Sequence, residues 1–234
     1  ASPVHYQNDP VQTIKTCVHG AINMLGLAKR TKAKIIQAST SEIYGDPEIS
    51  PQHENYWGNV NTLGPRSMYD ESKRFAEAAT QSYISTHNLH GSIARIFNTY
   101  GPRMAFDDGR VVTNFIYQAL NNQDITIFGD GSQTRSFSFI EDTLEGILKI
   151  LDYETSDVFN IGNDHEIKII ELANKIIDLT NSNSKIVNKD LPIDDPKQRK
   201  PDLSKAKKLL KYETKYDLET GLLKTISWFK KNYK

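Results

Sequence analysis

A tyrosine followed four residues later by a lysine, Tyr69 and Lys73, is the first pair in this chain that could do chemistry. On a helix, residues four apart lie on one face. An ammonium held beside a phenol favours the phenolate and lowers the phenol pKa, so such a pair can act as a general base near neutral pH. The same spacing also occurs on ordinary helices, so a catalytic role depends on the segments around the pair.

Two flanking segments strengthen the catalytic interpretation. Residues 34–38 form a short apolar run that predicts a buried strand, and small hydroxyl residues follow it at 39–41. In open parallel sheets, ligands bind beyond the carboxyl ends of the strands. Hydroxyl residues also form plain turns at strand ends, so the alternative without function stays open. A second polar and aromatic segment, residues 96–103, follows the next predicted strand.

Composition narrows the class of protein. The 234 residues are 38% hydrophobic and 25% charged, which suits one or two globular domains. Lysine plus arginine and aspartate plus glutamate both number 29, so the net charge of zero argues against bulk nucleic-acid binding. One cysteine, Cys17, cannot form an internal disulfide. We find no signal peptide, no apolar run long enough for a membrane span and no metal-ligand motif.

Helical and strand patterns alternate along the chain. Asp9 and Pro10 predict a helix start, and apolar spacing extends that helix over residues 9–31. Residues 46–66 lack periodicity and predict a loop, before a helix at 69–86 and a strand at 92–97. Further helices are predicted at 111–121, 141–153, 167–179, 203–210 and 218–231, and further strands at 125–128, 158–161 and 185–187. This alternation predicts an α/β fold with a parallel sheet.

Several motifs together resemble one family over nearly the whole chain. These motifs are residues 1–6, 23–30, 39–47, 56–58, 69–74, 94–103, 108–115, 129–137 and 199–202. On them the chain is identified as a member of the extended short-chain dehydrogenase/reductases that act on nucleotide sugars. Within that group it is most similar to the UDP-glucuronate decarboxylase (UDP-xylose synthase) family. The resemblance implies NAD as cofactor and a UDP-sugar as substrate.

The family chemistry implies a fold and a reaction. NAD oxidises the sugar C4 hydroxyl, the 4-keto uronic acid loses carbon dioxide, and the hydride returns to C4 to give the pentose. The implied fold is a Rossmann-like parallel sheet, here without its N-terminal strands, followed by a smaller substrate-binding α/β region. Residues 1–105 would belong to the NAD-binding domain. Residues 106–234 would mainly bind the nucleotide sugar, with the chain crossing back to the sheet.

The resemblance also implies site residues. The catalytic residues would be Thr40, Ser41, Glu42, Tyr69, Lys73 and Arg199. The cofactor would contact Ala38, Ser39, Tyr69, Lys73 and Thr99. The substrate would contact Tyr6, Lys15, Arg66, Asn98, Arg110 and Arg135.

Two of these positions point to decarboxylation. Related 4,6-dehydratases carry an Asp-Glu pair after the threonine, whereas Ser41 and Glu42 stand here. Related 4-epimerases usually lack the glutamate as well. Arg199 matches an arginine linked to decarboxylation, and its planar fork suits a carboxylate or a phosphate. Glu42 would either disfavour the substrate carboxylate in the ground state or handle a proton or water; the sequence leaves both open.

Some expectations concern what the chain lacks. The glycine-rich turn that cradles the NAD phosphates is absent, so the sequence is expected to begin several strand–helix units late. The alternatives are therefore a sibling dehydratase or epimerase, or an inactive fragment that keeps sugar-nucleotide binding or dimerisation. The family implies a homodimer through helices 9–31 and 69–86. A cytoplasmic location is expected, with the Golgi lumen open if a preceding segment carries an anchor.

Overall fold

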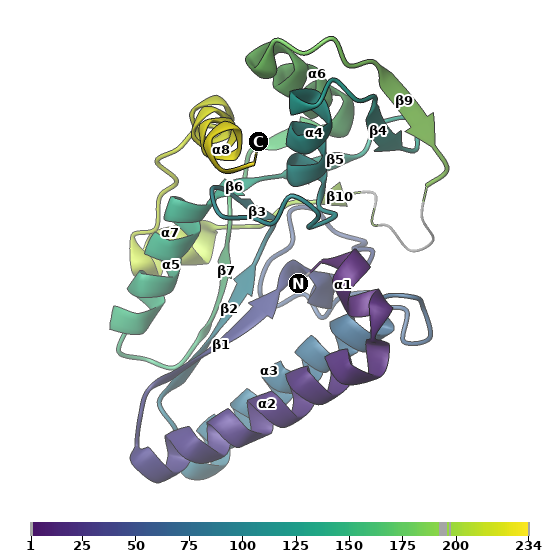
Figure 1. Cartoon of the computed structure of the whole chain (residues 1–234). Coiled ribbons are helices and arrows are strands. Elements are labelled where there is room, and N and C mark those ends of the chain that lie inside the picture. The colour runs from purple at the N-terminus through teal and green to yellow at the C-terminus, as the bar shows by residue number, and fades with distance from the viewer. Residues whose placement is uncertain (1, 192–195, 197, 234) are drawn as a thin grey trace.

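Three parallel strands form the main sheet of the computed structural model, which describes residues 2–191, 196 and 198–233. Their order is β1 (Ile35–Thr40), β2 (Gly91–Ile96), β7 (Val158–Ile161), so β1 is an edge strand in the described part of the chain. The strands end near one another, close to α1 (Figure 1). The α/β fold and its parallel sheet are as the sequence predicts.

Helices cover this sheet from two sides. The long helices α2 (Pro10–Thr31) and α3 (Ser67–His87) run side by side along one side, while α5 (Ile140–Asp152) and α7 (Ser204–Leu210) lie on the other (Figure 1). Segments after residue 139 therefore return to the first sheet. Their buried apolar side chains pack together with β2: Ala94, Ile150, Phe159, Ile161, Leu203, Ala206, Leu210 and Tyr212.

Helix α2 begins where the sequence predicts. The Asp9 side chain accepts a hydrogen bond from the Gln12 N–H, and Pro10 occupies the first turn. The helix ends at Lys32 in the left-handed conformation. Before it, the short helix α1 (Pro3–Asn8) was not predicted, because six residues are too few to show a helical period.

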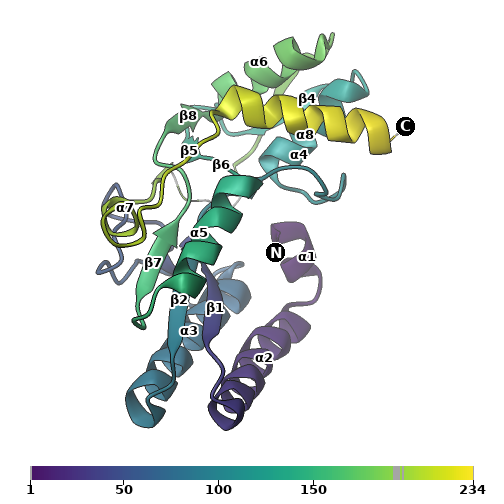
Figure 2. The same cartoon turned by 90° about the vertical axis from the view of Figure 1, so that its left-hand side faces the viewer.

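A second region carries the largest core. Helices α4 (Val111–Leu120), α6 (Ile169–Thr180) and α8 (Leu218–Asn232) pack with the parallel pair β4 (Ile125–Phe128) and β9 (Ile186–Lys189). Helix α8 crosses over this region in Figure 2. Hence the predicted helices and the strands at 125–128 and near 185–187 are present.

Several short elements escape the sequence patterns. They are a 3-10 turn η1 (Ser41–Tyr44) and the strands β3 (Thr99–Tyr100), β5 (Thr134–Ser136), β6 (Ser138–Phe139), β8 (Glu166–Lys168) and β10 (Gln198–Arg199). Strand β5 runs parallel to β10 and antiparallel to β8, and β3 pairs with β6. Two or three residues cannot display an alternating pattern, which explains the omission.

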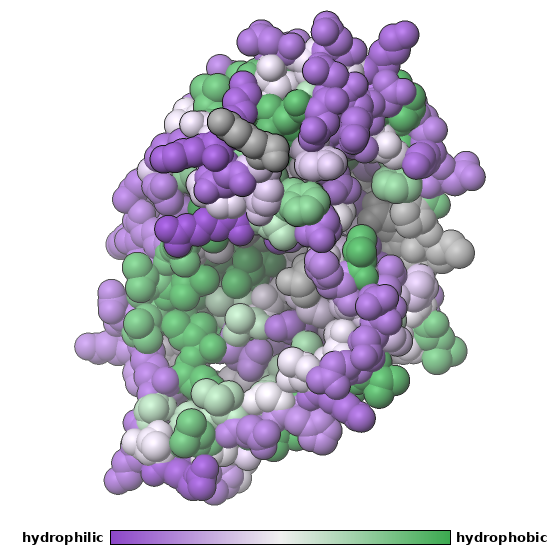
Figure 3. All heavy atoms as spheres, viewed as in Figure 1, coloured by the Kyte–Doolittle hydropathy of each residue, from purple (hydrophilic) through white to green (hydrophobic). Residues whose placement is uncertain are grey.

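Apolar side chains remain uncovered on one helix of the first sheet. Leu144, Leu148 and Leu151 of α5 are each about half exposed and share one face of the helix. Figure 3 shows apolar side chains gathered over α5 and the neighbouring strands. Among the residues described, no helix combines the length and apolar character needed to cross a bilayer.

Candidate active site

Tyr69 and Lys73 lie on one side of α3, as their spacing predicts. The Lys73 Nζ atom is 5.8 Å from the centre of the Tyr69 ring and donates a hydrogen bond of 2.9 Å to the Ala38 carbonyl. The Thr40 hydroxyl at the end of β1 lies near enough to the Tyr69 phenol to favour its ionised form. Strand β1 and helix α3 therefore bring a phenol, a hydroxyl and an ammonium to the carboxyl end of the sheet.

The expected lowering of the Tyr69 pKa is wrong for this state of the protein. Burial raises the pKa of Tyr69 to about 12, and the nearby carboxylate of Glu42 raises it further. The Thr40 hydroxyl works in the opposite direction but its effect is too weak to reverse the shift. Because Tyr69 is only 9% exposed, loss of solvation outweighs the help that its neighbours give to the phenolate.

Tyr6 of α1 covers the same phenol. Its ring lies parallel to the Tyr69 ring, with the two centres 4.8 Å apart. The Tyr6 hydroxyl is buried, and within the described residues it has no hydrogen-bond partner. Burial raises the Tyr6 pKa, so this phenol is neutral. The unexpected helix α1 thus places a ring and a free hydroxyl over Tyr69.

Glu42 lies between two guanidinium groups. Arg66 Nη2 donates to Glu42 Oε2 at 2.7 Å, while Arg199 reaches Oε1 at 2.6 Å and Oε2 at 3.0 Å. Burial alone would raise the pKa of Glu42, but Arg199 and then Arg66 hold it below its usual value. Glu42 is therefore an ionised carboxylate locked by three charge-assisted hydrogen bonds.

A loop without regular structure holds Arg199 in place. The Gln52 backbone N–H donates to the Lys200 carbonyl at 2.8 Å, and the Lys200 N–H donates back to the Gln52 side chain at 2.9 Å. Gln52 also accepts a hydrogen bond from the Asp202 N–H. On the other side, β10 pairs with β5 so that Arg199 stands opposite Arg135. Arg199 is consequently 5% exposed rather than a surface residue.

The residues expected to contact the nucleotide are spread over several elements. Arg135 is buried and donates to the carbonyls of Thr134 and Pro196. Arg110, at the start of α4, forms a two-pronged pair with Asp108. Asn98 follows β2, and its carbonyl accepts from the Ser138 N–H.

The other predicted residues differ in how close they come to the phenol. Ser41 is buried in η1, directly after Thr40. Lys15 is exposed on α2, and the described part of the chain offers it no ion pair. The Thr99 hydroxyl bonds Thr143 and the Phe97 carbonyl, so it is engaged within the fold. Within the described residues, no hydrogen bond or ion pair ties Lys15 or Thr99 to Tyr69.

A buried network behind β1 was missed by sequence reasoning. The Ser39 hydroxyl donates to Glu77 of α3, and Arg95 of β2 binds both oxygens of that carboxylate. Arg95 also donates to the Tyr44 hydroxyl at 3.0 Å. The network fixes the end of β1 against α3, so Ser39 turns its hydroxyl inward. No motif marks Glu77 in the sequence, and Arg95 lies within the motif at 94–103 without a role assigned to it.

A second residue without an assigned role is Asp70, next to Tyr69. It is 6% exposed, and burial raises its pKa to about 7. The sequence shows it only as part of the segment that contains Tyr69 and Lys73.

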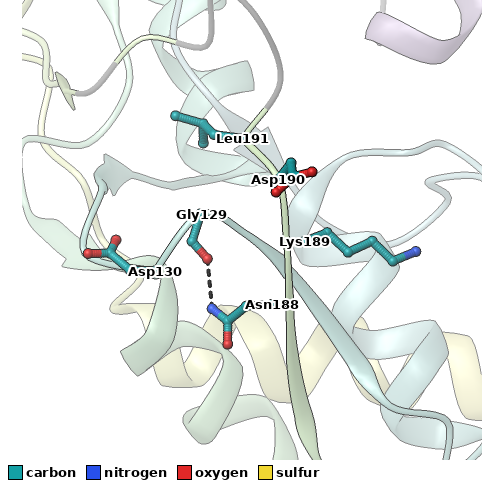
Figure 4. A pocket seen from close by; sticks show the side chains of 6 residues that line it. All are labelled: Gly129, Asp130, Asn188, Lys189, Asp190 and Leu191. Carbon is teal, nitrogen blue, oxygen red and sulfur yellow. Dashed lines mark hydrogen bonds between the residues drawn. The ribbon is translucent and has the colours of Figure 1, made fainter.

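A separate cavity lies in the second region. In its wall, the Asn188 side-chain amide donates a hydrogen bond of 2.7 Å to the Gly129 carbonyl (Figure 4). Its lining residues are Gly129, Asp130, Asn188, Lys189, Asp190 and Leu191. None of the predicted site residues lines this cavity. In the described chain, no three His, Cys, Asp or Glu side chains gather as metal ligands.

Comparison with curated proteins gives relatives of one kind. UDP-glucuronic acid decarboxylase 4 of Arabidopsis thaliana is 53% identical over 95% of this chain and 50% of its own length. UDP-glucuronic acid decarboxylase 1 of Xenopus tropicalis is 48% identical over 99% of this chain and 55% of its own length. The chain thus spans about half the length of these relatives.

Solved structures share the fold. UDP-glucose 4-epimerase from Thermotoga maritima, determined with UDP-glucose, has a TM-score of 0.93 and 26% identity over all of this chain and 75% of its own. UDP-glucuronic acid 4-epimerase from Bacillus cereus, with UDP-glucuronic acid and NAD, has a TM-score of 0.85 and 28% identity over 94% of this chain and 69% of its own. The model of the GDP-mannose 4,6 dehydratase family matches residues 2–225. With this match across almost the whole chain, on a parallel sheet with Thr40 and Tyr69 at its carboxyl end, the protein belongs to the GDP-mannose 4,6 dehydratase family.

Proposed function

We propose that the protein at its natural length is an NAD-dependent UDP-glucuronate decarboxylase that releases carbon dioxide and forms UDP-xylose. Relatives named UDP-glucuronic acid decarboxylase, 48% to 53% identical, support the assignment. The observation that carries it is the position of Glu42, held between two buried guanidinium groups close to Tyr69. A carboxylate so placed gives the site the charge pattern that a uronic acid substrate needs.

Proton transfer at C4 falls to Tyr69. Its phenolate would accept the proton of the C4 hydroxyl, and the Thr40 hydroxyl, which lies near the phenol, would orient the C4 oxygen. Because burial raises the Tyr69 pKa, each neighbour that favours the phenolate contributes to the rate. Ser41, in place of the aspartate of dehydratases, offers no second acid for elimination of water.

Decarboxylation needs a positive environment rather than an acid. Two guanidinium groups face the single Glu42 carboxylate, which leaves these three residues with an excess of one positive charge. The substrate carboxylate would enter this field. After C4 is oxidised, the C5–C6 bond breaks, its electrons pass toward the C4 carbonyl, and C5 gains a proton. The lowered pKa of Glu42 favours a charge-holding role over proton donation.

The described residues fit one end of NAD. Lys73 and Tyr69 would contact the ribose beside the nicotinamide, and the exposed Ala38 leaves room at the end of β1. Ser39 and Thr99 would contact NAD through van der Waals packing or their backbone atoms, since their hydroxyls are engaged elsewhere. When bound, NAD accepts the hydride from C4 and returns it after carbon dioxide has left.

The described residues do not supply a cradle for the NAD phosphates. Within the described residues, no glycine-rich turn joins a strand to a helix in the dinucleotide-binding pattern. We assign residues 1–105 to the cofactor side and residues 106–234 mainly to the UDP-sugar. Residues proposed for the UDP-sugar are Tyr6, Lys15, Arg66, Asn98, Arg110 and Arg135.

A sibling activity is the second candidate. Solved structures that share this fold include 4-epimerases, at 26% to 28% identity. Product analysis separates the cases, because an epimerase keeps the carboxylate and inverts C4, whereas a dehydratase gives a 4-keto-6-deoxy sugar.

The test supplies UDP-glucuronate and NAD to the protein at its natural length. We expect carbon dioxide and UDP-xylose from the wild type and a loss of at least about 100-fold in Tyr69→Phe, the range for removal of a general base. Arg199→His should slow release of carbon dioxide more than oxidation at C4. Full activity in both variants, or a six-carbon product from the wild type, would overturn the assignment.

We also propose a homodimer formed through α2 and α3. Val11, Ile14 and Ile22 of α2 and Phe75 of α3 are each at least 40% exposed. Ile14→Glu should lower the dimer fraction in analytical ultracentrifugation, while the control Leu223→Glu on α8 should not. A monomeric wild type would reject the interface. A cytoplasmic location is likewise proposed, and imaging of the tagged protein at natural length would test it.

A further inference from the structure

Asp70 is a buried carboxyl group without a visible partner. Its side chain makes no hydrogen bond or ion pair within the described residues, and its Oδ1 atom is fully buried. Burying an unpaired carboxylate is costly, so such a group is usually neutral or compensated by charges close by. Its place next to Tyr69 puts this cost inside the proposed active site.

The surroundings of Asp70 carry charges of both signs. Arg66 caps the start of α3, four residues before Asp70, and its carbonyl accepts a hydrogen bond of 3.2 Å from the Asp70 N–H. The charged and titratable groups that act on Asp70 or Tyr69 are Arg66 and Glu71 from α3 and its start, Glu42 from η1, Arg199 from β10, Tyr6 from α1 and Cys17 from α2. The two guanidinium groups favour ionised Asp70, while burial and Glu42 disfavour it.

The summed charge of the site shows which protonation state of Asp70 suits a bound uronate. Arg66, Arg199, Glu42 and an ionised Asp70 sum to zero, whereas protonated Asp70 leaves one positive charge. A uronate carboxylate brings one negative charge into the site. The anion is therefore balanced when Asp70 is protonated and unbalanced when Asp70 is ionised. With a pKa of about 7, Asp70 populates both forms near neutral pH.

We infer that Asp70 takes up a proton when the uronate enters and releases it when the carboxylate has left as carbon dioxide. The inference rests on the proposed function and makes Asp70 a positioning residue that acts through the charge of Arg66 and Arg199. The protons balance, because converting a sugar carboxylate to carbon dioxide and a C5–H bond consumes one proton. Asp70 takes its proton from solvent on binding and returns it to solvent once neutral xylose occupies the site. The proton that C5 gains comes separately from solvent, so each turnover consumes one proton in all.

Calorimetric titration tests this directly. The protein carries Tyr69→Phe, which stops turnover, and NAD is present; UDP-glucuronate is then titrated at pH 7.5 in buffers of different ionisation enthalpy. We expect uptake of about 0.5 to 0.8 proton per site, and close to none when Asp70→Asn is added. UDP-xylose, which lacks the carboxylate, should give no uptake in either protein.

A matched control is the neighbouring carboxylate. Glu71→Gln changes a side chain that is 39% exposed and is the weakest of the charges acting on Asp70, so it should alter proton uptake far less than Asp70→Asn does. Binding of UDP-xylose by the Asp70→Asn protein, within about threefold of its parent, verifies that the site is intact. Undiminished uptake in Asp70→Asn, or equal uptake with UDP-xylose, would overturn the inference.

A second measurement needs no variant of Asp70. With Asp70 present, affinity for UDP-glucuronate should fall about tenfold per pH unit well above pH 7, whereas affinity for UDP-xylose should stay constant. A flat profile for UDP-glucuronate between pH 6 and 9 would reject the role of Asp70. Failure of the proposed function is distinct, because the wild type would then form no carbon dioxide or UDP-xylose at all.

Discussion

Arg199 holds Glu42 by both of its terminal nitrogens, at 2.6 Å and 3.0 Å from the two carboxylate oxygens. These residues are 157 positions apart in the chain. The pair therefore ties the turn after β1 to the strand β10, and so joins the proton-transfer end of the site to the second region. A two-pronged guanidinium–carboxylate pair fixes geometry as well as charge.

Loss of Arg199 should destabilise the protein and abolish the proposed decarboxylation. Arg199→Gln leaves Glu42 buried with Arg66 as its remaining ion-pair partner, and breaking a buried pair from one side typically costs about 3–5 kcal/mol. Denaturant unfolding measures the loss. The control is Lys200→Gln, since Lys200 pairs with Glu166 at 3.3 Å in a more exposed setting, where pairs contribute about 1 kcal/mol or less. Equal destabilisation by the two variants would contradict a special role for the buried pair.

Two substitutions of Tyr6 separate its role in packing from its proposed contact with the substrate. Tyr6→Phe keeps the ring stacked on Tyr69 and removes a buried hydroxyl that lacks a partner in the described structure, so unfolding free energy should stay within about 1 kcal/mol or rise. Tyr6→Ala removes the ring and should cost about 3–5 kcal/mol.

The kinetics of Tyr6→Phe then test whether the Tyr6 hydroxyl contacts the sugar. If it contacts the sugar, Tyr6→Phe raises KM for UDP-glucuronate without loss of stability. Unchanged KM and kcat in Tyr6→Phe would assign Tyr6 to packing alone.

The sequence predicts the main helices and strands but not the polar contacts between distant segments. The long helices α2 and α3 and strands β1, β2 and β7 follow from apolar spacing and from the cap at Asp9, because those signals are local. The proximity of Tyr69 and Lys73 follows from the helical repeat.

The polar network around Tyr69 and Lys73 does not follow from the sequence. Arg199 meets Glu42 only because Gln52, in a loop without periodicity, binds the backbone around Lys200. The reversal of the Tyr69 pKa has the same origin, since burial depends on α1 and on the packing of distant segments. Local patterns carry no information on either.

Asp70 should make stability depend on pH in a direction opposite to most carboxylates. Its pKa is raised from 3.8 to about 7, so the folded state binds the proton more tightly than the unfolded state does. Stability from this group is full below about pH 4 and is lost as pH rises toward 7, by up to about 4 kcal/mol. Asp70→Asn cannot titrate and should exceed the wild type in melting temperature at pH 8.

The difference between Asp70→Asn and wild type should shrink as pH falls toward 5. Glu71→Gln serves as the solvated control and should show a much weaker trend, because Glu71 is the smallest of the charges acting on Asp70. A constant difference at all pH values would mean that Asp70 does not titrate in this range.

The turn that presents Glu42 depends on Gly45. This glycine has φ of +63°, and a Cβ atom there would lie 1.9 Å from the Asn59 carbonyl oxygen. Its N–H donates to the Glu42 carbonyl at 2.9 Å, so a shift of Gly45 moves Glu42. Gly45→Ala should therefore destabilise the protein by more than about 2 kcal/mol and lower kcat.

The control is Gly20→Ala on α2, where no atom lies within 4 Å of the added carbon. Alanine there should stabilise the helix by about 0.5–1 kcal/mol. Wild-type stability and kcat in Gly45→Ala would show that the turn relaxes without moving Glu42.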